Sequence, residues 1–306
     1  MKDGKLDQVD VSLFQILSRD SRVSLGQLEE ITGLEQENIR ARIKEMVQAG
    51  FIRKFTAKPS LVSMGIRSVL VWGRSRLRSL PDGLRAVRED DRVGWAAHST
   101  SGRFYFALHL KSEDDIGERI SRLERETMMI RPTHGVRNLF GQEKGSLELG
   151  QLEWKILGAL AEDHTLTGEE IAARIKKNKK DVTSILDDLI SAGAIEFSVD
   201  IDPNVVSNPL CMFHLESLEP ERVEVAAGEL MRKHAPGVLY FNTFSNIPVL
   251  TTTTLLGQDY EDILDLTRSI QDRPEFPYFE VNPLLASTSI ETWRDTLLRK
   301  HGTSKR

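Results

Sequence analysis

An internal repeat constrains the fold of this chain more than any other feature of its sequence. The segment starting at Leu6 aligns with the segment starting at Leu149, at an offset of 143 residues and without a gap for about 50 residues. The matched positions keep their chemical character: Ser24 pairs with Thr167, Leu28 with Ile171, Ile39 with Val182, Gly50 with Gly193 and Ile52 with Ile195. The 306 residues are therefore expected to form several modules rather than one core.

Each copy of the repeat has the pattern of three helices followed by a strand. The apolar residues of the first helix recur at helical spacing: Val9, Leu13, Ile16 and Leu17. A capping box, Ser24–Gln27 in the first copy and Thr167–Glu170 in the second, opens the next helix. A turn with Gly33 leads to a third helix, predicted from Glu35 to Ala49. This order is typical of a helix-turn-helix, and the strand expected from Phe51 starts a wing.

The segment after each copy predicts a second kind of module. Both halves show strand-helix-strand-strand-helix-strand patterns, which is the ferredoxin-like order. The segments are 68–72, 83–89, 94–98, 104–110, 116–125 and 136–140 in the first half, and 210–215, 223–233, 239–244, 249–255, 260–270 and 279–281 in the second, with a last helix at 290–300. The predicted fold class is α+β, with two winged helix-turn-helix units alternating with two ferredoxin-like modules. We expect domains at 1–60, 61–148, 149–200 and 201–306, in that order.

Charge is distributed unevenly along the chain. The net charge is −5, but residues 1–148 carry +4 and residues 149–306 carry −9. A protein that binds nucleic acid needs a local excess of basic side chains, whatever its total charge. Any contact with DNA is therefore expected from the N-terminal half.

The third helix of the first copy has the side chains that a DNA-reading helix needs. Ile39, Ile43, Met46 and Val47 form its core face on a helical wheel. The opposite side carries Glu37, Glu45 and two short side chains that suit base edges, Asn38 and Ala41. Basic residues on its edges and on the wing suit phosphate, as do the free N–H groups at the Ser24 helix start. The predicted DNA-binding residues are Ser24, Asn38, Arg40, Ala41, Arg42, Lys44, Arg53 and Lys54. The alternative is an ordinary solvated helix face.

The second copy does not keep this basic face. Ile185 stands where the first copy has Arg42, and Thr183 where it has Arg40. Its exposed side carries Asp181, Asp187 and Asp188, and four lysines surround its turn: Lys176, Lys177, Lys179 and Lys180. We therefore expect the second winged unit to be mainly structural.

The sequence offers no motif for catalysis, metal binding or membrane insertion. The seven histidines are scattered, and no phosphate loop, nucleophile elbow or Cys-x-x-Cys is present. The single cysteine, Cys211, lies in an apolar strand pattern and excludes an internal disulfide. We expect no catalytic residue, metal or cofactor. Without a signal peptide or a long apolar stretch, the chain is expected to be cytoplasmic.

A winged unit followed by a ferredoxin-like module resembles the Lrp/AsnC family, the feast/famine regulators of bacteria and archaea. The resemblance rests on the start Leu6-Asp-Gln-Val-Asp10, the run from Arg42 to Ala57, Met64-Gly65 and the hairpin from Val93 to Phe104. It covers residues 6–148 and, as a diverged second copy, 149–285. It implies a DNA-binding transcriptional regulator whose ferredoxin-like modules pair through their sheets, with modulation by a small molecule as a further expectation.

The resemblance also directs expectations about ligand and assembly. A small polar effector is expected at the turn of the hairpin, Ser99, Thr100, Ser101 and Gly102, where hydroxyls and glycine N–H groups converge. The family usually has Asp at the position of Tyr105, so a free amino acid is not implied. A two-fold symmetric operator has two half-sites, and a chain with one basic winged unit reads only one of them. Two chains are therefore needed. We expect a homodimer held by apolar strands around Trp95 and Phe104; a monomer with its two modules paired is the alternative.

Two other function classes fit the same domain order. Siroheme decarboxylases occur as two fused copies of these domains and carry an Asn-Tyr-Arg-x-x-His-like cluster on the hairpin. Here the hairpin keeps His98 and Arg103 but not the whole cluster. The third class is a ligand-sensing scaffold that does not bind DNA.

Overall fold

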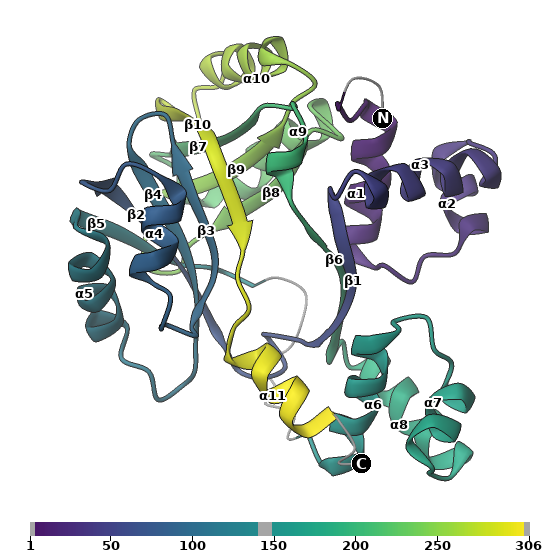
Figure 1. Cartoon of the computed structure of the whole chain (residues 1–306). Helices are drawn as coiled ribbons and strands as arrows, with labels where there is room; N and C mark the ends of the chain where they lie inside the picture. Colours follow the sequence, from purple (N-terminus) through teal and green to yellow (C-terminus); the bar gives the residue numbers. More distant parts are fainter. Residues whose placement is uncertain (1–3, 140–148, 303–306) are drawn as a thin grey trace.

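The computed structural model describes residues 4–139 and 149–302. Two three-helix units lie on one side of a body built from a large β-sheet and the helices that cover it (Figure 1). Winged units and ferredoxin-like modules alternate along the chain, which confirms the predicted α+β fold class.

The first winged unit consists of α1 (Gln8–Arg19), α2 (Leu25–Thr32) and α3 (Gln36–Gln48). The predicted capping box opens α2, and Gly33 ends it in left-handed backbone with a φ of 70°, which a residue with a Cβ rarely adopts. The apolar faces of the three helices share a core that also takes in Val206 and Leu256 from the second half of the chain. The unit is thus docked on the second ferredoxin-like module.

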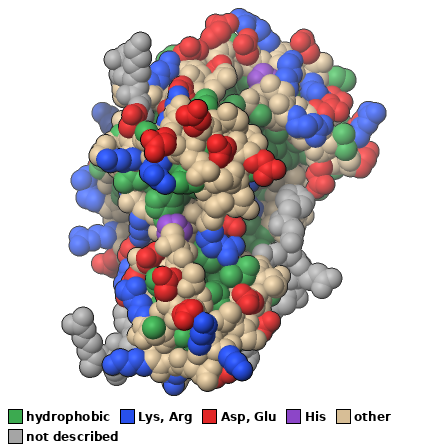
Figure 2. Space-filling view, turned by 90° about the vertical axis from the view of Figure 1, so that its right-hand side faces the viewer, with side chains coloured by type: hydrophobic (Ala, Val, Ile, Leu, Met, Phe, Trp, Pro, Cys, Tyr) green, Lys and Arg blue, Asp and Glu red, His purple; other side chains and the backbone are tan. Residues whose placement is uncertain are grey.

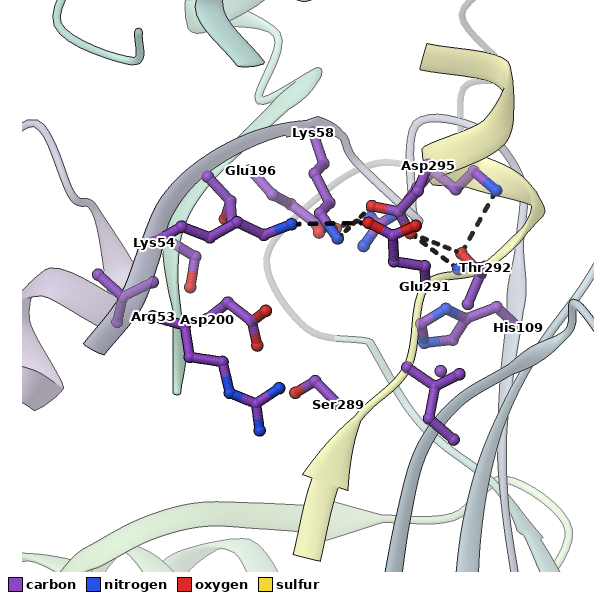
Figure 3. A pocket seen from close by; sticks show the side chains of 16 residues that line it. Arg53, Lys54, Lys58, His109, Glu196, Asp200, Ser289, Glu291, Thr292 and Asp295 are labelled. Atoms are coloured by element: carbon purple, nitrogen blue, oxygen red, sulfur yellow. Dashed lines mark hydrogen bonds and ion pairs between the residues drawn. The ribbon is translucent and has the colours of Figure 1, made fainter. Parts of the chain in front are cut away.

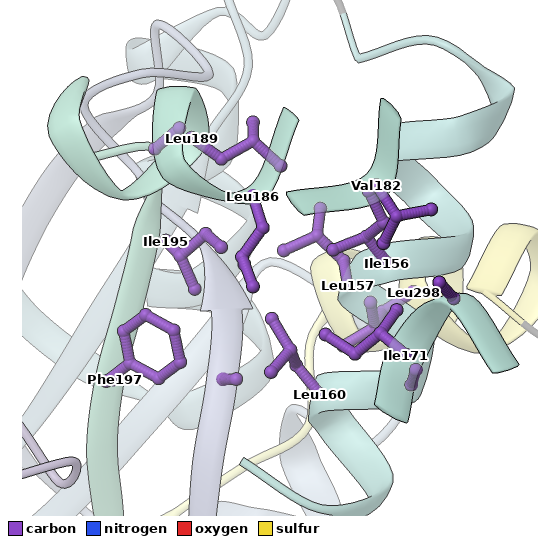
Figure 4. Close-up of a cluster of buried hydrophobic side chains, with 14 residues drawn as sticks. Ile156, Leu157, Leu160, Ile171, Val182, Leu186, Leu189, Ile195, Phe197 and Leu298 are labelled. Atoms are coloured by element: carbon purple, nitrogen blue, oxygen red, sulfur yellow. The ribbon is translucent and has the colours of Figure 1, made fainter. Parts of the chain in front are cut away.

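The second winged unit consists of α6 (Gln151–Glu162), α7 (Gly168–Ile175) and α8 (Lys179–Ser191). Its core, drawn in Figure 4, includes Leu298 from the last helix, α11 (Trp293–Gly302). Ala57 from the first half completes the same core. Each winged unit therefore buries apolar surface against residues from the other half of the chain.

The two wing strands pair with each other. β1 (Ile52–Pro59) and β6 (Ile195–Ile201) form a two-stranded antiparallel sheet, with Phe55 opposite Val199 and Thr56 opposite Ser198. Since Phe55 and Ser198 are equivalent positions of the repeat, this register gives the winged units an approximate two-fold relation. Figure 1 shows the pair between the body and the helical units.

Each ferredoxin-like module has a four-stranded antiparallel sheet. The first consists of β2 (Arg67–Ser75), α4 (Leu80–Ala86), β3 (Val93–Ser99), β4 (Arg103–Leu110), α5 (Ile116–Thr127) and β5 (Met129–Val136). The second consists of β7 (Leu210–Glu216), α9 (Val223–Lys233), β8 (Val238–Thr243), β9 (Leu250–Leu256), α10 (Tyr260–Gln271) and β10 (Tyr278–Ser289), with short 3₁₀ turns η1 (Pro203–Val205) and η2 (Pro220–Arg222). The two sheets form one eight-stranded sheet in the order β5-β2-β4-β3-β10-β7-β9-β8.

One long strand, β10, joins the two modules. Residues 278–283 pair with β7, and residues 284–289 pair with β3. The sequence predicted only residues 279–281 as a strand here, and it placed β5 at 136–140 rather than at Met129–Val136. Both differences come from pairing with distant strands, which a local pattern does not show.

The inner faces of the two modules enclose a shared core. Trp72 and Tyr105 of the first module lie against His214 and Phe244 of the second, with ring centroids 5.3 to 5.8 Å apart. The strands around Trp95 and Phe104, expected to hold two chains together, therefore pair within one chain. That basis for a homodimer is revised, because the interface is already used internally.

Candidate nucleic-acid interface

Arg40 and Lys44 lie on the exposed side of α3. Ile39 and Met46 are buried on one side of this helix, whereas Arg40, Ala41 and Lys44 are exposed on the other. In the described part of the chain, neither basic side chain has an ion-pair or hydrogen-bond partner. Residues four positions apart share one face of a helix, so both ammonium and guanidinium groups are available to one ligand. The winged units face the viewer in Figure 2, where Lys and Arg side chains line the left-hand edge and acidic ones are scattered among them.

Arg42 does not belong to that free surface. Its guanidinium donates to Asp7 at 2.7 Å and to Asp10 at 2.8 Å, and its Nε donates to Asn38 at 3.1 Å. Burial alone would raise the pKa of Asp7, but the Asp10 N–H and Arg42 outweigh it and hold the pKa below its usual value. Arg42 therefore fastens α3 to the start of α1, and its predicted role as a phosphate contact stays a prediction.

Asn38 and Ala41 lie beside a groove rather than on an open face. Both are exposed, and both line a hollow shared with Lys5, Ser207 and Gln258. Ser207 and Gln258 belong to the second ferredoxin-like module, so the body of the protein borders this side of α3. The Arg40 side of the helix does not line this groove.

The basic residues of the predicted wing point toward the body. Arg53 pairs with Asp202 at 3.0 Å and donates to Thr288, and Lys54 lies 3.8 Å from Glu291. Figure 3 shows these side chains around a cavity of about 460 Å³ between the wing strands, β10 and the start of α11. Their charges are paired between two parts of the chain, and the prediction that they extend a DNA contact stays a prediction.

Ser24 is exposed and fully engaged as a helix cap. Its hydroxyl accepts from the Gln27 N–H, and its own N–H donates to the Gln27 side chain. The other backbone N–H groups in the first turn of α2 can still donate hydrogen bonds to an anion. Its predicted role at a phosphate stays a prediction.

The second winged unit presents acidic side chains on the face that corresponds to Arg40 and Lys44. Thr183 is at the position of Arg40, and the exposed Asp187 is at the position of Lys44. Ile185, at the position of Arg42, packs against the apolar core. At this position the second unit therefore has apolar packing where the first has an internal ion pair.

The hairpin turn predicted to hold an effector is closed by its own hydrogen bonds. Ser99 is buried, its hydroxyl lies 2.9 Å from that of Ser101, and Ser101 contacts Asn282 at 3.1 Å. The Thr100 N–H donates to the Pro283 carbonyl, and Gly102 ends the turn with a φ of 73°. These groups are hydrogen-bonded within the protein, and their predicted role in binding an effector stays a prediction.

The hairpin residues that an enzyme of this domain order would use lie apart. His98 stacks on Phe104, with ring centroids 4.4 Å apart, and burial lowers its pKa. Arg103 is paired with Glu280 and lies next to Tyr105 on the other face of the sheet. Burial also raises the pKa of Cys211 to about 12, which leaves its thiol unreactive.

Within residues 4–139 and 149–302, no group of three or more His, Cys, Asp or Glu side chains is arranged to bind a metal ion. No helix in these ranges has the length and hydrophobicity of a membrane span.

Sequence reasoning missed three residues that line a second, more apolar cavity between the modules: His109, Arg137 and Tyr240. In the sequence, each of these residues is marked only by lying in or beside a predicted strand. They come together at one cavity because of how the two modules pack.

Comparisons with known proteins agree with this structure. A family model described as winged helix-turn-helix DNA-binding matches residues 6–53. An uncharacterized HTH-type transcriptional regulator of Pyrococcus abyssi is 35% identical over 116 residues, which are 37% of this chain and 77% of the relative. Another from Pyrococcus horikoshii is 26% identical over 145 residues, 47% of this chain and 98% of the relative.

The duplicated arrangement also occurs in a solved structure. The crystal structure of the siroheme decarboxylase NirDL is similar over 96% of this chain and 97% of its own, with a TM-score of 0.63 and 14% sequence identity. At that identity the likeness shows a shared fold. The sequence relatives show that this chain, whose own repeat gives it a duplicated form, belongs to the Lrp/AsnC family of helix-turn-helix transcriptional regulators.

Proposed function

We propose that this protein is a transcriptional regulator that binds double-stranded DNA through its first winged unit, residues 1–60. The observation that carries the proposal is the exposed face of α3, where Arg40 and Lys44 have no partner among the described residues. The Arg42 ion pairs hold this helix in place, so the two charges are presented by a fixed element. Phosphate contacts from such side chains supply much of the affinity of a DNA-binding protein.

Fluorescence anisotropy with duplex DNA from the protein's own promoter tests this proposal. Arg40→Ala/Lys44→Ala should weaken binding to all sequences and reduce the slope of log affinity against log salt by up to about 0.9 per lost contact. The control is Arg88→Ala/Arg125→Ala, which makes the same change in net charge at exposed sites in the first ferredoxin-like module. Equal affinity and slope for the two double variants would contradict the assignment of α3.

An enzymatic role like that of siroheme decarboxylase is the second candidate, and the likeness of fold to NirDL is what favours it. Against it, His98 and Arg103 lie on opposite faces of their sheet and each has a partner inside the protein. We propose a non-enzymatic protein. Incubation with siroheme, followed by absorbance spectroscopy, should leave the tetrapyrrole unchanged.

A further inference from the structure

The space between the two ferredoxin-like modules holds both a packed cluster of side chains and a cavity. One end holds the rings of Trp72, Tyr105, His214 and Phe244. The other end contains a cavity of about 280 Å³, which most of the inner strands of both modules line. Pockets of about this size upward, with a mostly apolar lining and a few placed polar groups, are typical of small-molecule sites.

The lining of this cavity is mainly apolar. Leu70, Trp95 and Ala107 come from the first module, and Met212, Leu239 and Leu256 come from the second. Such a surface favours the uncharged body of an organic molecule over a free inorganic ion.

One permanent charge, Arg137, lies in this apolar setting. It follows β5, and burial lowers the pKa of its guanidinium, which still stays protonated at neutral pH. Its one side-chain hydrogen bond goes to the neutral Ser68 hydroxyl at 3.4 Å, and in the described ranges no carboxylate pairs with it. Arg137 is partly buried, and Glu196 acts on it from a distance without an ion pair, so this position favours an anion that could pair with it directly.

Further polar groups line the same cavity. Tyr240, which is partly exposed, and Asn242 line it from β8, and Ser289 lines it from the end of β10. The His109 Nδ1 is buried without a hydrogen-bond partner, and burial lowers the pKa of this imidazole to about 3, so it is neutral. A guanidinium, with these groups around it, matches the two oxygens of a carboxylate.

We propose that this cavity binds a small organic carboxylate, whose charged group pairs with Arg137 and whose apolar body lies between Trp95 and Leu239. The cavity also has Ile201 of β6 and Pro203 of η1 in its wall, and it shares Gly94, His109 and Ser289 with the charged cavity of Figure 3. An occupant therefore touches the strand that carries the second wing. Asn204 of η1 holds β10 through two hydrogen bonds with the Ser287 backbone, at 2.7 and 3.0 Å, so this wall is one connected structure.

Binding is tested with benzoate, phenylacetate and hexanoate, and with benzamide as the neutral control, by intrinsic fluorescence of the full chain. Trp95 lines the cavity, so saturable quenching by a carboxylate should disappear in Trp95→Phe. Arg137→Gln should weaken binding at least tenfold, while Arg74→Gln, at an exposed arginine of β2, leaves it unchanged.

A second variant tests the apolar part of the site independently of the charge. Ala107→Leu adds volume at the cavity wall and should abolish binding with Arg137 still present. The proposal is overturned if benzamide binds as well as benzoate, if Arg137→Gln binds as tightly as the wild type, or if none of the three carboxylates gives saturable binding at millimolar concentration.

The link to DNA rests on the proposed function. A carboxylate that binds should change the affinity for promoter DNA about fivefold or more, and the same change should be absent in Arg137→Gln. Carboxylate binding with unchanged DNA affinity overturns the coupling. Carboxylate binding by a protein that does not bind DNA at all overturns the proposed function and supports the ligand site.

Discussion

The Arg42 guanidinium donates a hydrogen bond to the Asp10 carboxylate at 2.8 Å and so joins α3 to the first turn of α1. Asp10 is almost fully buried, and it also accepts from the Asp7 N–H, so the ion pair is part of the α1 capping box. Loss of a hydrogen-bonded charge partner at a buried carboxylate usually costs more than loss of a surface pair. The stability of the first winged unit therefore depends on this contact.

Arg42→Ala should lower the free energy of unfolding by about 1.5–3 kcal/mol. Arg40→Ala, two residues away on the exposed side, should change it by about 0.5 kcal/mol or less. Urea unfolding followed by circular dichroism measures both. Equal stabilities for the two variants would mean that the Arg42 ion pairs do not hold α3.

The lysines around the turn of the second winged unit should not contribute to DNA binding. Lys179 is paired with Glu169 at 2.6 Å, and the acidic residues of α8 lie close by. Lys176→Ala/Lys177→Ala/Lys180→Ala should therefore leave affinity and salt dependence close to the wild type. Anisotropy of the full chain is the suitable measurement, because each winged core contains residues from the other half of the chain. A loss as large as that of Arg40→Ala/Lys44→Ala would show that both units contact DNA.

The last helix is tied to the second winged unit by a close backbone crossing. A Cβ on Gly158 of α6 would collide with the backbone of Gly302 in α11. Gly→Ala in a helix normally stabilises a protein by up to about 1 kcal/mol, but here the collision reverses the sign and Gly158→Ala should cost about 1–3 kcal/mol. Gly228→Ala in α9 is the matched control, because its nearest contact is the flexible end of Arg232 at 3.5 Å, and it should stabilise. Thermal unfolding that ranks the two variants in the opposite order would contradict this crossing.

The repeat and its turn chemistry allowed much of the fold to be predicted. The capping boxes at Ser24 and Thr167 and the left-handed Gly33 are local features, so the sequence shows them directly. The pairing of β1 with β6 and of β3 with β10 was not predicted, because strand partners far apart in the chain leave no local pattern.

The candidate site was predicted less completely than the fold. A helical wheel places Arg42 on the edge of α3, but it does not show that Asp7 and Asp10 lie beside that edge. In the same way, Arg53 is basic and on a wing, yet its partner Asp202 is about 150 residues away. Only the tertiary structure shows which charged side chains are paired and which are free. It therefore also decides which residues remain available for DNA.

We propose that two chains act together on a symmetric operator. Among the described residues, the first winged unit carries two exposed basic side chains four positions apart on its third helix, Arg40 and Lys44, whereas α8 has Thr183 and Asp187 at these positions. Reading two half-sites one helical turn apart needs two such units. Because the sheets pair within the chain, the second chain must use another surface. Light scattering after gel filtration should give about twice the 34.6 kDa of one chain, at least with operator DNA bound. A mass of one chain with DNA bound would contradict this arrangement.

His214 should make the stability of the body depend on pH. Its ring is buried between Trp72 and Tyr105, its Nε2 has no hydrogen-bond partner, and burial lowers the pKa of the imidazole to about 4. The unfolded chain takes up the proton near its ordinary pKa of about 6.5, so the folded state loses stability as the pH falls from about 6.5 to 4. His214→Phe removes this dependence, and between pH 6.5 and 5 the wild type should lose about 1–2 kcal/mol more than the variant. Urea unfolding at four pH values measures the difference, and parallel profiles for the two proteins would show that this histidine is not buried in its neutral form.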